Sequence, residues 1–470
     1  MKGSFWILAT VLLLGCGSPA TPSSDAGGED ASDASRPDAF RIRDAGADVF
    51  SLPDARSGCE GEGCRIVELA LGFSTSCARR QNGEVLCWGR GQNGELGDGN
   101  SRHSPGCLRL GTSERIDCSD HPVRVALPGP ARRLHARGGF DFCAELEGGA
   151  FHCWGSFGYT VEGEMERVRF APEPVPWLSG AQSYSSAFTF ACWLDGEGKG
   201  RCIGSNQNGQ LGHGDFMVRI QPVHVRIQRG AMREVLSGLV EIETSKAFGS
   251  TACARSTAEL YCWGRNHEGQ LGRPGPHERC ISGIEEFDCS SLAVALDFPM
   301  ASMIRDLAFG SSHACALLMD GSLYCWGSNR RGELGLGTPG SPDMRSREMP
   351  TRIDSLSNVA EVELGARHSC ARKQDGSVWC WGANDLGQLG SGMEDHPGPQ
   401  CMSEGMVIDC SSVPVQVVGI TDAVELAVGR EHSCVVRSNG EVWCWGSNEH
   451  YECGSGERQP LLQPQRVIGL

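Results

Sequence analysis

The chain has 470 residues, a formal net charge of −16 and 24 cysteines. Its 58 Asp and Glu outnumber its 42 Lys and Arg, and no basic cluster is present. This balance argues against nucleic acid as a partner, because phosphates need basic stripes, and the cysteine count points to an oxidising compartment.

The N-terminus resembles that of a bacterial lipoprotein. Met1-Lys2 is a short basic start, and the apolar run from Phe5 to Leu14 is too short to span a bilayer. Leu14-Gly15-Cys16 resembles the box at which lipoproteins are cleaved and acylated. We therefore predict a signal peptide over residues 1–16, lipidation of Cys16, and anchoring to a bacterial outer membrane or cell surface. An uncut membrane anchor or a plain signal peptide is the alternative.

Residues 17–65 are predicted to be a disordered tether. From residue 17 to 58 the chain consists mainly of Asp, Ala, Ser, Gly and Pro, a composition that cannot bury enough apolar surface to fold. Part of the negative charge lies there, at Asp25, Glu29, Asp30, Asp33, Asp38, Asp44, Asp48 and Asp54.

Residues 66–470 contain seven copies of one phrase. Each copy reads G-x-x-(H/T)-x-C-A, then a polar turn with Gly, a short apolar run, and C-W-G-x-N-x-x-G-x-L-G, with variations. In the third copy Ile203 replaces the Trp, which leaves six Cys-Trp-Gly steps. Self-similarity at a spacing of about fifty to sixty-five residues indicates a solenoid or a propeller.

Each copy is predicted to form a β-hairpin. Asn82-Gly83, Asp320-Gly321, Asp375-Gly376 and Asn439-Gly440 are strong turn signals, because Gly accepts the positive φ that the turn requires. A three-residue loop places the two cysteines of a copy opposite one another, close enough to bond. The seven predicted hairpin pairs are Cys77 and Cys87, Cys143 and Cys153, Cys192 and Cys202, Cys253 and Cys262, Cys315 and Cys325, Cys370 and Cys380, and Cys434 and Cys444.

A second phrase, P-x-x-V or a relative of it, precedes each copy after the first and also ends the chain at Pro464 to Leu470. The first hairpin is reached through Val67-Glu68-Leu69 and has no such phrase before it. Seven of each, offset by part of a repeat, predict an all-β, disulfide-rich, seven-bladed β-propeller closed by pairing of its N- and C-terminal strands. Closure removes the exposed sheet edges that invite aggregation.

The phrases H-S-C-A, D-G-x-V, W-G-x-N and G-Q-L-G resemble the repeats of the regulator of chromosome condensation family over about residues 66 to 470. The resemblance implies a seven-bladed propeller. Members include a nuclear exchange factor for a small GTPase and a secreted bacterial inhibitor that grips β-lactamases, so the resemblance also implies protein binding. Guanine-nucleotide exchange on a small GTPase is not expected here, because the predicted signal peptide exports the protein. Fold-level analogy of this kind is an associational argument.

Three further close cysteine pairs follow the G-x-L-G phrase of the first, fourth and sixth copies: Cys107 and Cys118, Cys280 and Cys289, and Cys401 and Cys410. Equal position in the repeat predicts that the loops 98–121, 273–291 and 391–412 share one face. Disulfide-braced loops on a rigid scaffold are typical of binding surfaces, with tolerated insertions as the alternative. The candidate contact residues are Arg109, Arg115, Glu285, Glu286, Met402 and Met406.

No metal or cofactor is predicted. Zinc sites use cysteines two to four residues apart, whereas these pairs have eight to ten residues between them. Asp117, Asp288 and Asp409 are conceivable calcium ligands, but an Asp before Cys-Ser more often accepts a nearby backbone N–H in a turn. Cys59 and Cys64 make one more pair, and Cys453 is left over, either buried or available to an external partner.

The repeat explains the matches to catalytic motifs. The two G-x-G-x-x-G matches, from Gly89 and from Gly335, open no helix in a βαβ unit and are turns. His313, His368 and His432 occupy a repeat position that holds Thr in other copies, so we predict a structural hydrogen-bonding slot. The repeat Trp residues are predicted to pack between neighbouring blades rather than to form a carbohydrate platform.

Two function classes follow. The first is an envelope-anchored binding scaffold, a monomeric ring that binds an unidentified protein, or a glycan, through its disulfide-braced loops. The second is an envelope enzyme, a polysaccharide lyase or hydrolase that works at the mouth of the central channel. Membrane contact is expected only through the N-terminal lipid.

Overall fold

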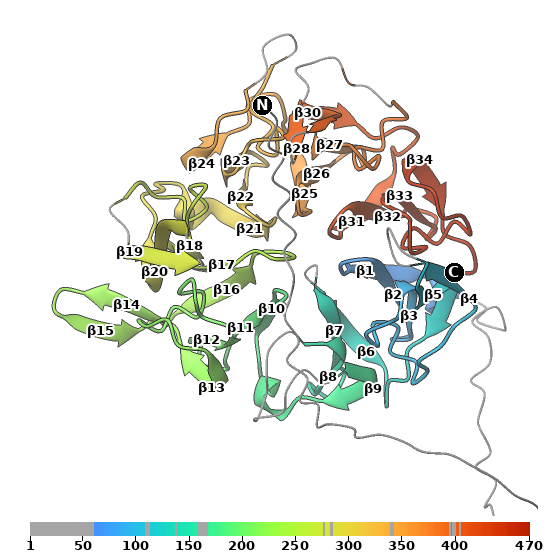
Figure 1. Cartoon of the computed structure of the whole chain (residues 1–470), viewed down its shortest axis with the longest axis horizontal. Helices are drawn as coiled ribbons and strands as arrows, with labels where there is room; N and C mark the ends of the chain where they lie inside the picture. Colours follow the sequence, from blue (N-terminus) through green and yellow to red (C-terminus); the bar gives the residue numbers. More distant parts are fainter. Residues whose placement is uncertain are drawn as a thin grey trace, which may run out of the picture. The chain divides into compact units, whose positions relative to one another are not determined.

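A computed structural model describes residues 61–108, 113–136, 139–157, 168–275, 278–282, 285–338, 343–393, 396, 401–403 and 406–470. The predicted signal peptide, Cys16, Cys59 and most of the predicted tether lie outside them. The described residues form 34 β-strands and the 3-10 helices η1 (Glu62–Cys64), η2 (Pro176–Leu178) and η3 (Ala301–Met303). None of these helices is long and apolar enough to cross a membrane. The all-β propeller class is confirmed, with the sheets arranged around an axis (Figure 1).

The strands of the described residues pair into seven sheets of four or more strands and one of two. The first sheet, ordered β1-β2-β3-β5-β4, contains β1 (Ile66–Leu71), β2 (Thr75–Arg80), β3 (Val85–Arg90), β4 (Pro105–Leu108) and β5 (Arg115–Arg124). The next sheet contains β6 (Ala131–His135), β7 (Phe140–Leu146), β8 (Phe151–Ser156) and β9 (Val168–Pro174), and the one after it β10 (Ser183–Ser186), β11 (Phe190–Leu194), β12 (Gly200–Gly204) and β13 (Arg219–His224).

The largest sheet, ordered β15-β14-β20-β18-β17-β16 with β19 paired to β20, contains β14 (Arg226–Arg229), β15 (Met232–Val235), β16 (Leu239–Thr244), β17 (Thr251–Ser256), β18 (Leu260–Arg265), β19 (Glu278–Ser282) and β20 (Glu285–Ala295). Another contains β21 (Ile304–Phe309), β22 (His313–Leu318), β23 (Leu323–Gly327) and β24 (Arg347–Arg352).

The remaining sheets complete the chain. They contain β25 (Val359–Leu364), β26 (His368–Lys373), β27 (Val378–Ala383) and β30 (Cys410–Gln416), then the small sheet of β28 (Cys401–Ser403) and β29 (Met406–Ile408), and last β31 (Ala423–Val428), β32 (His432–Arg437), β33 (Val442–Gly446) and β34 (Leu461–Arg466).

The prediction that the N- and C-terminal strands pair in one sheet is wrong. Strand β34, which holds the last P-x-x-V phrase, pairs with β33, and β1 pairs with β2. The physical reason is that each P-x-x-V phrase is the fourth strand of the preceding hairpin's sheet, so each sheet's four-strand core comes from one stretch of chain. At the end of the predicted tether, Arg65 O and Gly63 O accept hydrogen bonds from Gln81 N–H and Asn82 N–H of the first hairpin turn.

The hairpin register and its disulfides are confirmed. Cys77 lies directly opposite Cys87, and their Cα atoms are 4.1 Å apart. Gly83 has a φ of 83°, as the predicted turn requires. The other hairpin disulfides are Cys143–Cys153, Cys192–Cys202, Cys253–Cys262, Cys315–Cys325, Cys370–Cys380 and Cys434–Cys444. In the chain-entropy model each short loop contributes about 2 to 3 kcal/mol.

The repeat Trp residues join six of the seven larger sheets to the sheet before them, as predicted. The indole of Trp381 is fully buried, and its Nε1–H donates to Glu333 O at 2.7 Å. Glu333 is the variable residue of the preceding G-x-L-G phrase. The equivalent bonds join Trp88 to Glu452, Trp154 to Glu95, Trp263 to Gln210, Trp326 to Gln270, and Trp445 to Gln388.

Contacts of the same kind join the first and last sheets without an exchanged strand. Trp88 Nε1–H donates to Glu452 O at 3.0 Å. Leu69 N–H of β1 donates to Glu425 of β31 at 2.7 Å, and Arg430 N–H donates to Gly72 O at 3.2 Å. The ring is therefore closed by side-chain and loop contacts between complete sheets.

The predicted histidine slot is confirmed and runs across sheets. His313, His368 and His432 place Nε2 2.9 to 3.0 Å from Ser369, Ser433 and Ser76, respectively, of the next sheet. Ser369 and Ser76 give their own hydroxyl protons to backbone carbonyls, so they accept from the imidazole N–H. Burial lowers the pKa of all three imidazoles to about 3. These histidines are neutral structural groups at pH 7.

Cys453 is buried with an exposed fraction of 0%, and it occupies the Leu position of the last G-x-L-G phrase. Its Sγ lies 3.2 Å from Ser447 O. Burial raises the pKa of this thiol well above its ordinary value. Of the two interpretations left by the sequence, the structure supports a core residue.

We expect Gly335→Ala to lower the free energy of unfolding by about 2 kcal/mol or more. Gly335 has a φ of 66°, and an added Cβ would lie 2.9 Å from Nε1 of Trp381. Equilibrium denaturation with intact disulfides measures the change.

The matched control is Gly99→Ala. Gly99 has a similar positive φ, 91°, but a Cβ there meets nothing within 4 Å. Because only backbone strain remains, we expect this variant to lower the free energy of unfolding by about 1 kcal/mol. Equal losses for the two variants would show that contact with Trp381 does not limit this position.

We expect Cys453 to resist a maleimide reagent in the native chain and to react once the chain is denatured with its disulfides intact. The buried thiol is kept both protonated and inaccessible, and the thiolate is the reactive form. Mass spectrometry of the labelled chain gives the result. Rapid labelling of the native protein would contradict the buried placement.

Candidate functional site

All three extra cysteine pairs form disulfides, Cys107–Cys118, Cys280–Cys289 and Cys401–Cys410. Each disulfide braces a β-hairpin, formed by β4 and β5, by β19 and β20, and by β28 and β29, where Cys410 is the first residue of β30. The second cysteine of each pair lies opposite the residue that follows Trp-Gly: Cys118 opposite Arg90, Cys289 opposite Arg265, and Cys410 opposite Ala383. The three hairpins therefore leave their sheets at one register.

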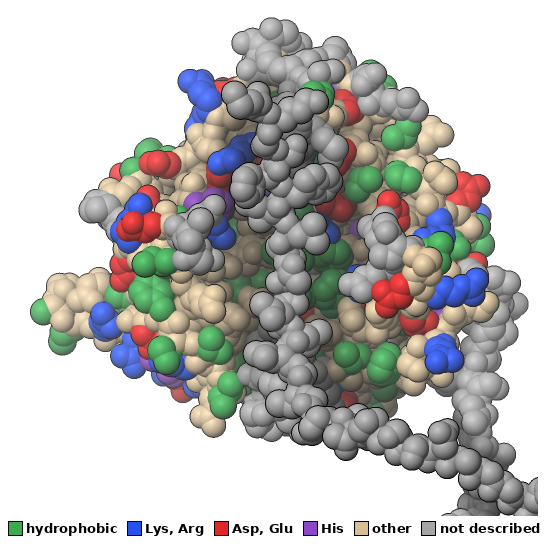
Figure 2. All heavy atoms as spheres, viewed as in Figure 1, with side chains coloured by type: hydrophobic (Ala, Val, Ile, Leu, Met, Phe, Trp, Pro, Cys, Tyr) green, Lys and Arg blue, Asp and Glu red, His purple; other side chains and the backbone are tan. Residues whose placement is uncertain are grey.

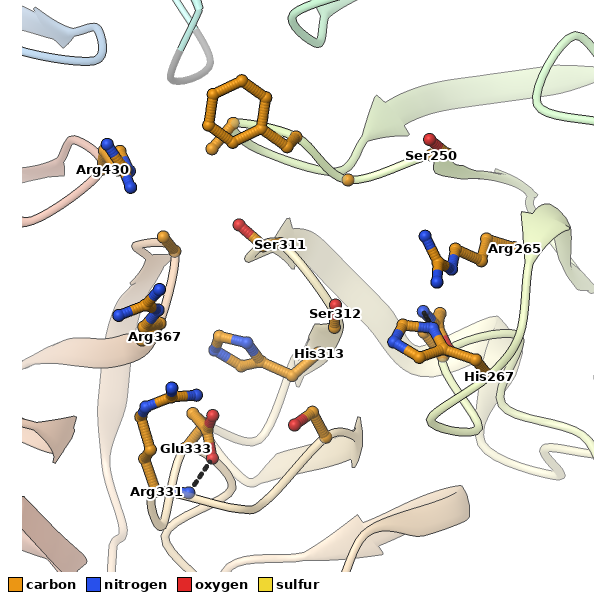
Figure 3. Close-up of a pocket in the computed structure, with 16 residues that line it drawn as sticks. Ser250, Arg265, His267, Ser311, Ser312, His313, Arg331, Glu333, Arg367 and Arg430 are labelled. Atoms are coloured by element: carbon orange, nitrogen blue, oxygen red, sulfur yellow. Dashed lines mark hydrogen bonds between the residues drawn. The ribbon is translucent and has the colours of Figure 1, made fainter. Parts of the chain in front are cut away.

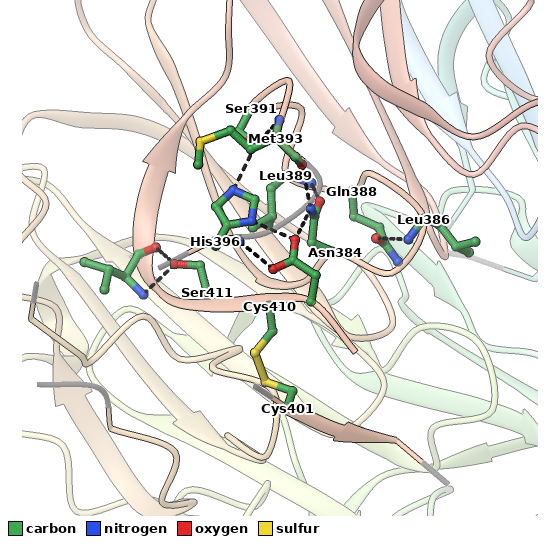
Figure 4. Close-up of polar contacts among 12 residues, drawn as sticks. Asn384, Leu386, Gln388, Leu389, Ser391, Met393, His396, Cys401, Cys410 and Ser411 are labelled. Atoms are coloured by element: carbon green, nitrogen blue, oxygen red, sulfur yellow. Dashed lines mark hydrogen bonds and ion pairs between the residues drawn. A yellow bond between two sulfur atoms is a disulfide. The ribbon is translucent and has the colours of Figure 1, made fainter. Parts of the chain in front are cut away.

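Internal polar contacts hold two of these hairpins. Asp409 accepts hydrogen bonds from His396 N–H at 2.8 Å and from Asn384 Nδ2 at 2.5 Å, and its other contact is His396 Nδ1 at 2.7 Å (Figure 4). Asp117 is bonded in the same way to His103, by the backbone N–H and by Nδ1. Both aspartates accept a backbone N–H as predicted, but the donor lies 14 or 13 residues away in the sequence and not in the same turn.

The third aspartate differs. Asp288 pairs with Arg279 at 2.6 Å, and Arg279 also contacts Glu286 at 3.0 Å. The backbone O of Asp288 accepts a hydrogen bond from Asn266 N–H, as Asp117 O and Asp409 O accept from the equivalent residues. The hairpin of β19 and β20 thus presents an exposed ion-pair cluster where the other two carry a histidine.

The structure places three of the six candidate contact residues only by their backbone. Glu285, Met402 and Met406 lie in β20, β28 and β29, respectively. Arg109 lies outside the described residues. Arg115 and Glu286 are exposed, one in each of two hairpins. That these residues contact a partner stays a prediction.

A cavity of about 260 Å³ lies near the axis, among the loops that join the first and second strands of several sheets (Figure 3). Its lining includes Phe248, Arg265, Arg331, Arg367 and Arg430. In Figure 3, Arg331, Arg367 and Arg430 lie on one side and Arg265 on the other. Glu333 is the single carboxylate among the described lining residues.

Four phenylalanines form a ring of contacts beside this cavity. Phe73 packs against Phe140 with ring centroids 4.7 Å apart, Phe140 against Phe188 at 5.4 Å, and Phe188 against Phe248 at 5.2 Å. Phe248 returns to Phe73 at 5.8 Å and is 62% exposed. An apolar floor therefore adjoins the arginines.

The guanidinium of Arg430 lies over this floor, 4.0 Å from the Phe73 ring and 5.7 Å from the Phe248 ring. Burial lowers the pKa of Arg430, and the positive charge of Arg367 lowers it further, against the opposing effect of Glu431. Four arginines and one carboxylate are among the lining residues of this cavity. On the face seen in Figure 2, acidic and basic side chains are interspersed over the parts that are not grey.

The cavity is linked to the hairpins. Arg265, which lines it, lies over the Phe287 ring of β20 at 4.4 Å. A neighbouring cavity of about 390 Å³ is lined by both Arg430 and Ile116, the latter from the first hairpin. Sequence reasoning missed this site, because Phe73, Phe188 and Arg430 lie at the variable positions of G-x-x-(H/T). Variation at an otherwise regular repeat position is the signal that could have found it.

We expect the imidazole of His103 to titrate with a pKa of about 9. Burial alone lowers this pKa, but the hydrogen bonds and charges of Asp117 and Asp98 outweigh it. The folded pKa exceeds the ordinary 6.5, so the pair's contribution to stability is complete below pH 6.5 and is lost as pH rises through 9. NMR of the His ring follows the titration.

Asp98→Asn should lower the His103 midpoint, and His313 should show no titration between pH 5 and 9. A His103 titration midpoint near pH 6.5 in the unaltered protein would contradict its contacts with Asp98 and Asp117.

Comparisons with known proteins agree with the fold. Two models, each described as Regulator of chromosome condensation (RCC1) repeat, match residues 258–317, 320–372, 375–436 and 439–470, and residues 66–95, 304–333, 359–388 and 423–452. The ultraviolet-B receptor UVR8 of Arabidopsis thaliana is 26% identical over 417 residues, which cover 86% of this chain and 82% of the receptor.

The E3 ubiquitin-protein ligase HERC2 of Homo sapiens is 29% identical over 283 residues, 59% of this chain and 5% of the ligase. The crystal structure of Kap60 bound to yeast RCC1 (Prp20) contains a chain similar to this one, with a TM-score of 0.62 at 18% identity over 86% of this chain and 85% of that chain. This likeness shows the fold alone. By its repeats, the protein belongs to the regulator of chromosome condensation repeat family.

Proposed function

We propose that this protein is an exported, lipid-anchored scaffold whose seven-bladed ring binds another protein through the face that carries the three disulfide-braced hairpins. The observation that carries the proposal is the common register of those hairpins, each of which starts opposite the residue after Trp-Gly. Because the sheets are related around an axis, equal register supports placing all three on one face. Rigid loops on such a face bind with little loss of conformational entropy.

Several features support the ring and its location. The seven larger sheets each contain a four-strand antiparallel unit, one per blade of the proposed ring. Ten described disulfides favour an oxidising compartment, in agreement with the predicted export. A relative of the same fold was solved bound to the protein Kap60, which favours a protein partner.

The polysaccharide enzyme has less support. Glycoside hydrolysis generally needs two carboxylates that flank the bond to be cleaved. Among the lining residues that the structure describes, the axial cavity offers only Glu333, which is 3% exposed and accepts Arg331 N–H at 2.7 Å. A second cavity is lined by Glu68, Glu361, Glu363 and Glu425, but Glu68, Glu361 and Glu425 each accept a backbone N–H of a neighbouring sheet. We therefore favour binding over catalysis.

The test is affinity capture with the whole chain, made in an oxidising compartment, as bait against the source organism's envelope and secreted fractions. We expect one protein to be retained in near-stoichiometric amount. Replacing the three hairpins together by Gly-Ser turns should abolish its retention while the melting temperature shows an intact ring.

The matched control replaces the hairpin of β14 and β15, which is also exposed but is not disulfide-braced. This variant should retain the partner. Undiminished capture by the folded triple variant, or no retained protein with the unaltered chain, would reject the proposed face.

A further inference from the structure

We propose that the axial cavity is a carboxylate-binding site that takes an acidic side chain of the protein partner, held between Arg367 and Arg430 beside the phenylalanine floor. This inference rests on the proposed function and adds the chemistry that the scaffold recognises. The floor is defined here as Phe73, Phe140, Phe188 and Phe248.

Two guanidinium groups at this site lack a strong internal partner. The Arg367 side chain, which is half-buried, makes no hydrogen bond or ion pair within the described residues. Arg430 has a single acidic neighbour, Glu431, at 3.6 Å, and its other described contacts are the Phe73 and Phe248 rings. Charged groups in such surroundings are usually paired, so the site is arranged for an anion from outside.

The chain's own nearby carboxylate does not fill this role. Glu333 is buried, and its Oε2 accepts the Arg331 backbone N–H at 2.7 Å, the turn-bracing position that Glu95 and Glu452 occupy in other sheets. Burial raises the pKa of Glu333, and four arginines line the cavity beside this one carboxylate. The charge facing the cavity is therefore predominantly positive.

The apolar floor favours an acidic side chain over a simple inorganic anion. Phe248 is 62% exposed beside the cavity and offers surface that only an organic ligand covers. An aspartate or glutamate on a partner's loop brings methylene groups and neighbouring side chains with its carboxylate. Guanidinium groups bind carboxylates through paired, charge-assisted hydrogen bonds, and those bonds strengthen when water is excluded.

The cavity also lies where a partner on the hairpins would reach. Arg265 lines the cavity and stacks on Phe287 of the hairpin formed by β19 and β20. Arg430 also lines the neighbouring cavity that Ile116 of the first hairpin borders. A loop inserted at the axis would therefore contact both features.

The test uses the whole chain and a fluorescent blocked tetrapeptide of alternating Phe and Glu, with a matched peptide in which Gln replaces Glu. We expect the Glu peptide to bind and the Gln peptide to bind at least about tenfold more weakly, because hydrogen bonds to charged groups are the stronger ones. Raising the salt concentration should weaken the Glu peptide's binding. Fluorescence anisotropy gives the dissociation constants.

Arg367→Gln and Arg430→Gln should each weaken binding of the Glu peptide about tenfold. Arg367→Lys should lose less, since it keeps the charge. The control is Arg352→Gln, at an exposed position on the outer strand β24, which should have no effect. Because Arg430 also packs on Phe73, Arg367 is the decisive position, and an unchanged melting temperature confirms that each variant is folded.

Equal binding of the Glu and Gln peptides, equal effects of Arg367→Gln and Arg352→Gln, or inorganic phosphate binding as tightly as the Glu peptide would each overturn the inference. The scaffold is tested separately. If Arg367→Gln still retains the captured partner and hairpin replacement loses it, the carboxylate site fails and the binding face stands. If no variant changes capture, the proposed function fails as well.

Discussion

The hydrogen bond from a tryptophan indole to the backbone of the preceding sheet is the contact on which the ring depends. In each case the indole is buried, and its N–H donates to the variable residue of a G-x-L-G phrase. The following Gly lies against the ring face, and a Cβ there would come within 3 Å of the indole. One residue type at one offset therefore fixes the spacing between neighbouring sheets. The junction of the second and third sheets is the exception. Ile203 replaces the Trp there and packs in one core cluster with Phe157, which follows β8 of the preceding sheet.

This contact also explains why the ring needs no shared strand. Trp88 and Ser76 of the first sheet both donate to Glu452 O of the last, just as internal neighbours are joined. The contact that closes the ring is thus one more copy of the repeated interface between sheets. Within each sheet a disulfide crosses the central hairpin inside the core, where its cysteines are fully buried. Small cores of this kind gain from covalent constraint on the unfolded chain.

A scaffold fixed by repeated contacts leaves its remaining positions free to differ. The hairpins follow Trp-Gly in three sheets and are braced by their own disulfides, with His–Asp contacts in two and ion pairs of Arg279 with Asp288 and Glu286 in the third. At the axis, the loop positions that hold Phe73 and Phe188 in some sheets hold Ala366 and Arg430 in others. Structural residues recur in this chain, whereas the candidate functional residues do not. That contrast is the physical basis for placing the site at the axis and the hairpins.

Sequence alone determined the all-β propeller class, the hairpin register, the ten described disulfide pairs, and the structural roles of the Trp and His positions. All of these follow from short-range spacing or from a pattern repeated along the chain, so one copy tests another. Tertiary structure decided what spacing cannot: that the last P-x-x-V strand stays in its own sheet, that Cys453 fills a leucine position in the core, and that four phenylalanines and several arginines meet at the axis. The first two outcomes depend on which strand a segment pairs with and on how a side chain packs, which spacing alone does not specify. The third depends on contacts between residues far apart in the sequence, such as Phe73 with Phe248 and Arg430, which form only when the ring is assembled.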